Sequence, residues 1–276
     1  MDRELNVRCK HGHRNHSFLF IPLSDAPDYS TQTITFTQHL FLAMLEHPEY
    51  LKRAQAELDS VLGAGPTRFP TFEDRPKLPF IDALFSETLR WGVPVPLGAS
   101  CLTRYHSTTL FLPDLGLPHR VMQDDFYDGH FIPKGSLVFA NIWAMLRDPD
   151  VFPEPERFNP ERYLEQVDDE TARRRDPRVF AFGFGRRRCP GAHLVESSVW
   201  LMLATMLAML DIGKPRDKNG KEMEPDVKFE NSVFRSDSFH PHRKSTQSMT
   251  YRTSTRFVVI LRPRSDAVLK LIEGET

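Results

Sequence analysis

One ten-residue segment constrains this chain more than any other. Residues 182–191 read Phe-Gly-Phe-Gly-Arg-Arg-Arg-Cys-Pro-Gly. The two glycines let the backbone approach something flat and bulky, and the arginines offer cationic forks for carboxylates. Because Pro190 favours a first helical turn, Cys189 stands where unpaired backbone N–H groups and the helix dipole stabilise a thiolate. The segment therefore predicts an anionic sulfur ligand beside the start of a helix.

Two other interpretations of this segment compete with a ligand role. A phosphate-binding loop would need a Lys-Ser/Thr pair and a preceding strand, and the sequence offers neither. A single cysteine before a helix is more often a packed small hydrophobic residue than a ligand. Cys189 taken alone therefore does not decide the function.

Proline and glycine mark three helices on the N-terminal side of this segment. Apolar residues within 40–45 suit a buried helix face that ends near Pro48, and Pro48 then opens a second helix. Gly63 is well placed as the C-terminal stop of that helix. A third helix is expected from Pro79 to Trp91.

The C-terminal side combines one strong helix with irregular and β-prone stretches. A helix is predicted over 189–210, and a hairpin over 130–141 with its turn at 133–135. Residues 147–188 are rich in Pro, Arg and Asp and are predicted to form a long coil. The tail around 257–261 is β-prone. The expected fold class is mainly α with small β-elements.

Charge and cysteine content exclude several classes of protein. Lys and Arg total 36 against 37 for Asp and Glu, which gives no indication of a nucleic-acid partner. Three widely spaced cysteines do not form a disulfide framework. No stretch approaches the roughly 18–20 apolar residues that span a bilayer, and residues 1–16 do not resemble a secretory signal. We therefore expect no membrane anchor in this chain, and a cytoplasmic location.

Three motifs, taken in order, resemble the cytochrome P-450 superfamily. The pattern Phe182-x-x-Gly185-x-Arg187-x-Cys189-x-Gly191 is similar to its haem-binding signature. Upstream, residues 87–90 read Glu-Thr-Leu-Arg, like the Glu-x-x-Arg of the family, and residues 155–158 match its Pro-Glu-Arg-Phe element. The chain is identified as a C-terminal, haem-binding part of such a protein, resembling fungal members.

This resemblance implies a cofactor, haem b, and roles for particular residues. Cys189 is the implied axial ligand of the iron, and Phe182 is implied to pack near its sulfur. Gly185 and Gly191 belong to the same signature. Arg187, and also Arg120, are implied to pair with haem propionates.

The shorter motifs are implied to act as scaffold. Glu87, Arg90 and Arg157 are expected to form a buried triad that holds residues 147–188 onto the core. Glu and Arg three residues apart on a helix are otherwise most often a solvated surface pair.

The function implied by the resemblance is a monooxygenase that inserts one atom of dioxygen into a small apolar organic substrate. The expected electron donor is an NADPH-dependent reductase. The parent family is expected at the cytosolic face of the endoplasmic reticulum membrane.

The sequence departs from the family at the positions that deliver protons. Counting back from residues 41–44, the acid–alcohol pair of the family falls at Thr31 and Gln32, so no acid is present. This departure keeps two alternatives open. One is a truncated, inactive remnant that folds or binds haem poorly. The other is a haem-thiolate peroxygenase or isomerase that does not need the pair.

Three stretches lack the patterning of their neighbours. They are residues 1–32, which are expected to be disordered, and insertions near 99–115 and 235–256 within a truncated haem-binding domain over 33–276. We hypothesise that all three are translated intron sequence. Within the first stretch, a cysteine and three histidines cluster too tightly for the usual zinc spacing, so a disordered basic tail is the favoured interpretation. These residues are Cys9, His11, His13 and His16.

Overall fold

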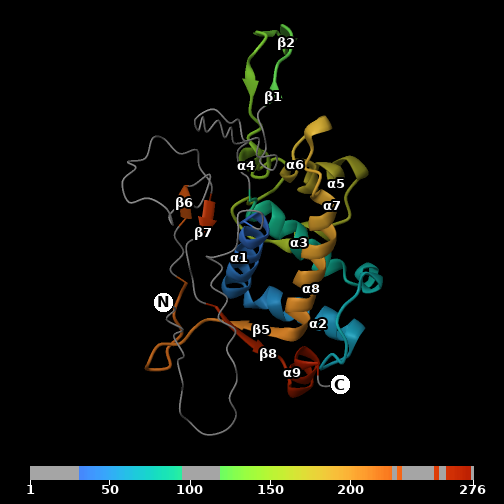
Figure 1. Cartoon of the computed structure of the whole chain (residues 1–276), viewed down its shortest axis with the longest axis vertical. Helices are drawn as coiled ribbons and strands as arrows, with labels where there is room; N and C mark the ends of the chain where they lie inside the picture. The colour runs from blue at the N-terminus through green and yellow to red at the C-terminus, as the bar shows by residue number, and fades with distance from the viewer. Residues whose placement is uncertain (1–30, 95–118, 226–228, 232–251, 255–258, 275–276) are drawn as a thin grey trace, which may run out of the picture.

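The computed structural model describes residues 31–94, 119–225, 229–231, 252–254 and 259–274. Helices form the bulk of these residues, and four two-stranded sheets lie at their edges (Figure 1). The expected fold class, mainly α with small β-elements, is confirmed. The zinc cluster, the insertion near 99–115 and most of the stretches 1–32 and 235–256 lie outside the described residues.

Three helices form the N-terminal half of the core. They are α1 (Thr31–Glu46), α2 (Pro48–Leu62) and α3 (Pro79–Trp91). Pro48 and Pro79 occupy the first helical turns of α2 and α3, where a missing N–H costs nothing. Gly63 ends α2 with a φ of 89°, a backbone angle that suits glycine. These predicted boundaries are confirmed.

The helix that follows the cysteine begins later than predicted. Ala192–Leu194 (α7), the π-turn Val195–Val199 (η5) and Trp200–Met209 (α8) form one helical run. Cys189 lies outside it, because the Ala192 N–H donates to the Cys189 carbonyl oxygen at 3.3 Å in a turn before the helix.

The same helical run bears on the membrane prediction. The 18 residues from Ala192 to Met209 are long and apolar enough to cross a bilayer by length and composition, and 44% of them are buried inside the structure. This differs from the prediction that no stretch of the sequence approaches the length and apolar character of a membrane span. Trp200, Leu203 and Leu207 are fully buried against α2 and α3, which is the packing of a core helix.

The predicted hairpin over 130–141 is wrong in its pairing. Strand β3 (His130–Ile132) pairs with β2 (Asp125–Tyr127), and β4 (Leu137–Val138) pairs with β1 (His119–Arg120). The turn that sets β2 against β3 lies at Asp128 and Gly129, whose φ angles of 49° and 77° are typical of a tight hairpin turn. The bend at 133–135 joins the two sheets instead.

The C-terminal segments close the far end of the core. Strand β5 (Leu210–Gly213) pairs with β8 (Ile260–Pro263), which confirms the β-prone tail. A second pair joins β6 (Phe229–Asn231) to β7 (Arg252–Ser254). The final helix, α9 (Asp266–Glu273), was not predicted, although a serine cap and a left-handed glycine bound it.

Short helical turns interrupt the stretch that was predicted to be coil. The largest is α5 (Asp169–Arg175), accompanied by α4 (Ile142–Met145) just before this stretch and α6 (Arg178–Ala181) within it. Single turns of 3₁₀-helix lie within it at η3 (Pro160–Tyr163) and η4 (Gly185–Arg187), and a longer 3₁₀-helix, η2 (Phe72–Lys77), precedes α3. This stretch packs on α3, so the core reaches the cysteine loop through α3.

Candidate functional site

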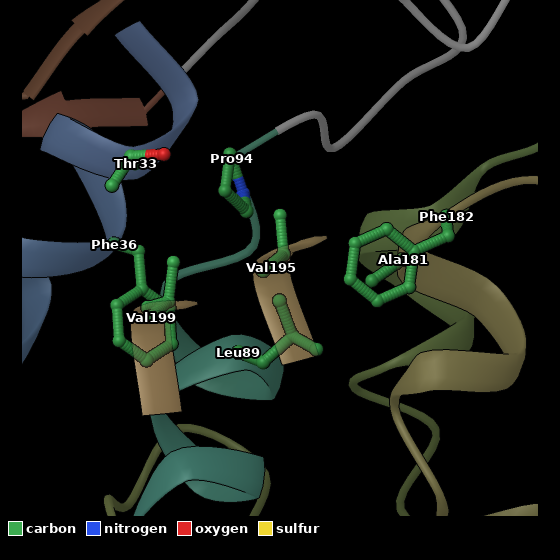
Figure 2. A pocket seen from close by; sticks show the side chains of 8 residues that line it. All are labelled: Thr33, Phe36, Leu89, Pro94, Ala181, Phe182, Val195 and Val199. Atoms are coloured by element: carbon green, nitrogen blue, oxygen red, sulfur yellow. The ribbon is translucent and has the colours of Figure 1, made fainter. Parts of the chain in front are cut away.

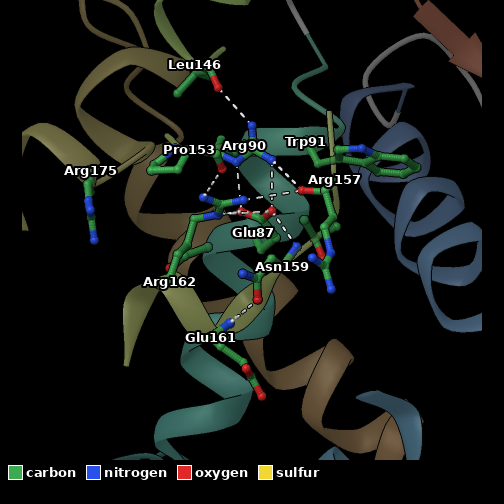
Figure 3. Close-up of polar contacts among 12 residues, drawn as sticks. Glu87, Arg90, Trp91, Leu146, Pro153, Arg157, Asn159, Glu161, Arg162 and Arg175 are labelled. Carbon is green, nitrogen blue, oxygen red and sulfur yellow. Dashed lines mark hydrogen bonds and ion pairs between the residues drawn. The ribbon is translucent and has the colours of Figure 1, made fainter. Parts of the chain in front are cut away.

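A buried ion cluster lies on α3 beneath the irregular stretch (Figure 3). Glu87 and Arg90 are fully buried and form two hydrogen bonds of 2.8 Å, in the fork geometry of arginine and carboxylate. The guanidinium of Arg162 approaches Glu87 at 3.3 Å, and the Asn159 N–H donates to the same carboxylate at 2.8 Å. Burial lowers the pKa of Arg90, but the hydrogen bonds that its guanidinium donates to the charged Glu87 carboxylate outweigh burial, so the pKa is raised.

The prediction that the Arg157 side chain belongs to this cluster is wrong. The side chain of Arg157 is exposed and pairs with Glu154 at 3.1 Å. Only the Arg157 carbonyl oxygen reaches the cluster, where it accepts from Arg90 and Arg162 at 3.4 Å each.

The sequence did contain a signal for the correct arginine. Pro-Glu-Arg-aromatic occurs twice, at 155–158 and again at 160–163. The second copy begins η3, whose proline and Asn159 cap turn Arg162 inward.

The cluster anchors the irregular stretch through its backbone. Arg90 Nη1 donates to the Leu146 carbonyl oxygen at 2.9 Å, and Arg162 Nη1 donates to that of Pro153 at 3.0 Å. Charged donors thus satisfy carbonyl groups that irregular backbone would leave unpaired. The residues that lead toward the cysteine loop are fixed to α3 in this way.

The loop at 182–191 has the backbone that its glycines predict. Gly183 and Gly185 have φ angles of 75° and 62°, and no atom lies within 4 Å of a Cβ placed on either. The Cys189 N–H donates to the Phe182 carbonyl oxygen at 2.8 Å, which closes the loop. Cys189 is a partly buried free thiol.

An apolar hollow lies beside this loop (Figure 2). The hollow is partly open to solvent. Its walls come from α1, the end of α3, the cysteine loop and the helix behind it. The lining residues are Thr33, Phe36, Leu89, Pro94, Ala181, Phe182, Val195 and Val199.

The arginines of the predicted site are exposed. Arg186 and Arg187 lie on η4, and neither is paired with a carboxylate among the residues that the structure describes. Arg120 is exposed on β1, with its guanidinium about 3.8 Å from the position a Gly135 Cβ would take. No contact among the described residues joins Arg120 to the cysteine loop.

The donor set fits a flat, apolar group that carries acidic substituents and needs a sulfur ligand. A free thiol, an open glycine backbone and an apolar hollow lie together, and arginines without carboxylate partners stand beside them. Mainly helical architecture around such a site defines the chain as a helical protein whose residues suit a thiolate-ligated prosthetic group.

The chain belongs to the cytochrome P-450 family, whose sequence profile matches residues 29–232. It is 43% identical over 206 residues to cytochrome P-450 monooxygenase claT of Ampulloclitocybe clavipes, covering 75% of this chain and 38% of that protein. It is 37% identical over 243 residues to the tryptamine 4-monooxygenase of Psilocybe cyanescens, covering 88% of this chain and 41% of that protein.

A solved structure shares the fold. A zebra fish cytochrome P-450 in a structure with abiraterone has a TM-score of 0.57 and 29% sequence identity, over 84% of this chain and 45% of that chain. The chain therefore spans less than half the length of these relatives.

Proposed function

We propose that this chain forms the haem-binding part of a monooxygenase that inserts one atom of dioxygen into a small apolar organic substrate. The observation that carries the proposal is the free Cys189 thiol on a glycine loop beside an apolar hollow. Relatives named as monooxygenases support the reaction class.

The proposed cofactor is haem b, bound between the cysteine loop and the neighbouring hollow, with Cys189 as its axial ligand. Phe182, the first residue of the loop, lines the hollow, and its carbonyl oxygen accepts from the Cys189 N–H, so the proposed role of its ring is to pack near the sulfur. Gly185 keeps the backbone open for the ring, and a side chain at Gly191 would stand 3.7 Å from the Cys189 sulfur. Arg187 supplies a cation for a propionate. The same role for Arg120 stays a prediction.

A thiolate-ligated haem supplies electron density that favours O–O cleavage. The residues of this chain hold the sulfur and give the hollow its apolar walls. Thr33 is the hydroxyl-bearing residue among the eight that line the hollow. It follows Thr31 and Gln32, whose side chains lie outside the described residues, and it offers a hydrogen bond to a bound substrate.

We propose an NADPH-dependent reductase as the electron donor. Exposed arginines without ion pairs in the described structure lie on α5 and on the cysteine loop, among them Arg173, Arg174 and Arg186. Such a basic surface steers an acidic partner toward the loop. For the parent protein we propose the cytosolic face of the endoplasmic reticulum membrane.

The reduced, carbon-monoxide-bound absorption spectrum after haem reconstitution tests this proposal. We expect the strongly red-shifted Soret band of thiolate-ligated haem. Cys189→Ser should abolish it, whereas Cys101→Ser, a matched cysteine removal elsewhere, should leave it unchanged. The same band in Cys189→Ser would show that the ligand is misassigned.

The missing acid at position 31 favours a second candidate, a haem-thiolate peroxygenase or isomerase. Turnover supported by peroxide without any reductase would identify it. Loss of haem on gel filtration would instead favour an inactive remnant.

A further inference from the structure

The helix behind the cysteine loop contains a turn that needs side-chain support. Residues Val195–Val199 form a π-turn, an uncommon geometry that recurs at functional sites. Such a turn leaves carbonyl groups short of their usual helical partners. The Ser197 hydroxyl donates to the carbonyl oxygens of His193 at 2.8 Å and Leu194 at 3.2 Å. The Ser197 side chain thus adds a donor to the carbonyl groups just before this turn.

The remaining support comes from a distant arginine. Arg75 Nη1 donates to the Glu196 carbonyl oxygen at 3.1 Å. Arg75 belongs to η2, which is separated from the π-turn by more than a hundred residues of sequence. The contact is therefore set by tertiary structure, and not by the helix itself.

Two further contacts fix the guanidinium of Arg75 in place. Its Nε and Nη2 atoms lie 3.0 and 2.9 Å from the same Oδ1 atom of Asp82 on α3. Its central carbon lies 4.9 Å from the ring centre of Trp200, which is fully buried on α8. Phe72 of the same η2 turn also stacks on this ring. One side chain therefore joins η2, α3, the π-turn and α8.

The π-turn forms one wall of the apolar hollow. Val195 and Val199, its first and last residues, both line the hollow (Figure 2). The turn is also tied to the cysteine loop, since the Val195 N–H donates to the Gly191 carbonyl oxygen at 3.0 Å, two residues after Cys189. A displacement of the turn would move this wall and the helix start beside the sulfur together.

We propose that Arg75 is a positioning residue for the candidate site. Its planar fork binds Asp82 and the Glu196 carbonyl group at once and so fixes the π-turn that carries Val195 and Val199. A lysine keeps the charge but presents a compact point cation, which cannot reproduce the planar fork that serves both partners. The part of this proposal that concerns haem rests on the function proposed above.

Hydrogen exchange of the haem-free chain tests the contact directly. Arg75→Lys should speed exchange of the amides at 195–200 by about tenfold, the effect of weakening one hydrogen bond to a charged donor. Arg68→Lys is the matched control, because Arg68 pairs with Asp74 in the same region and lies outside the contacts of the π-turn. Amides of α2 should keep their protection in both variants. Equal rates at 195–200 in the two variants would overturn the proposal.

The haem-loaded chain gives a second, spectroscopic readout. At equal haem content, the carbon-monoxide-bound Soret band of Arg75→Lys should be shifted or broadened, while that of Arg68→Lys matches the wild type. Asp82→Asn, which leaves the Glu196 contact in place, should give a smaller change. An unaltered band in Arg75→Lys would refute a role at the site. If the wild type binds no haem, the proposed function fails, yet the exchange rates still decide whether Arg75 holds the turn.

Discussion

At the scale of single residues, the first prediction concerns Arg162, the arginine that contacts Glu87 from the irregular stretch. Arg162→Ala should destabilise the chain by roughly 1.5–3 kcal/mol, because it removes charged hydrogen bonds to the buried Glu87 carboxylate and to the Pro153 carbonyl oxygen, while Arg90 still neutralises Glu87. Arg157→Ala is the matched control, since its exposed side chain pairs only with Glu154, and it should change stability little. Urea unfolding of both variants measures the difference. If Arg157→Ala were the less stable of the two variants, the Arg157 side chain would have to belong to the cluster.

A second prediction for a single residue concerns how the contribution of Asp74 to stability depends on pH. The hydrogen bonds from Arg68 hold the pKa of Asp74 well below its usual range. A carboxyl group with a depressed pKa stabilises the fold above its unfolded pKa of about 3.9 and loses that contribution as the pH falls further. Asp74→Asn should therefore be less stable than the wild type at pH 7, and the gap should narrow below about pH 4. Thermal unfolding across this range checks it, and a constant gap would contradict the linkage.

At the scale of elements, one carboxylate replaces the missing cap of α3. The residue before the helix is Leu78, whose side chain cannot accept a hydrogen bond. Instead, the two carboxylate oxygens of Glu57 on α2 accept from the Phe80 and Ile81 N–H groups at 2.9 and 3.0 Å. A negative charge at this position also interacts favourably with the positive, N-terminal end of the helix dipole. The helix that carries Glu87 and Arg90 is thereby fixed to α2.

Glu57→Gln should cost about 1 kcal/mol, the usual effect of losing a cap. Glu46→Gln, an exposed change at the end of α1, should have almost no effect. Denaturant midpoints of the two variants give the comparison. Equal midpoints would mean that the cap contributes nothing measurable.

The helices could be predicted from sequence because their boundary signals are local. Pro48, Gly63 and Pro79 act through their own backbone geometry, wherever the rest of the chain lies. Strand pairing is less local, since two turn signals compete in this segment, Asp128-Gly129 and residues 133–135, and only the tertiary structure shows that the first joins the paired strands. The contact between Arg75 and the π-turn spans distant segments, so only the tertiary structure reveals it.

At the scale of the whole molecule, the cytochrome P-450 profile covers most of the chain, and similarity to the tryptamine 4-monooxygenase of Psilocybe cyanescens extends over 243 residues. The profile matches from residue 29 to residue 232, so it begins near the end of the first unpatterned stretch and stops just before the third. Between these points, patterned elements lie on both sides of the insertion near 99–115. The ion cluster joins 87–90 to 162 across that insertion, so the flanking segments pack together directly.

The hypothesis that residues 1–32 and the insertions near 99–115 and 235–256 are translated intron sequence rests on their lack of patterning. Family-like sequence resumes on both sides of the central insertion, and α3 on one side binds η3 on the other. Mature message should therefore lack the codons of all three stretches while keeping those for the cysteine loop. Sequencing the spliced transcript measures this, with the codons for 182–191 as the internal control. Codons for 99–115 in mature message would show that the insertion is part of the protein, and the hollow would then have to be considered together with it.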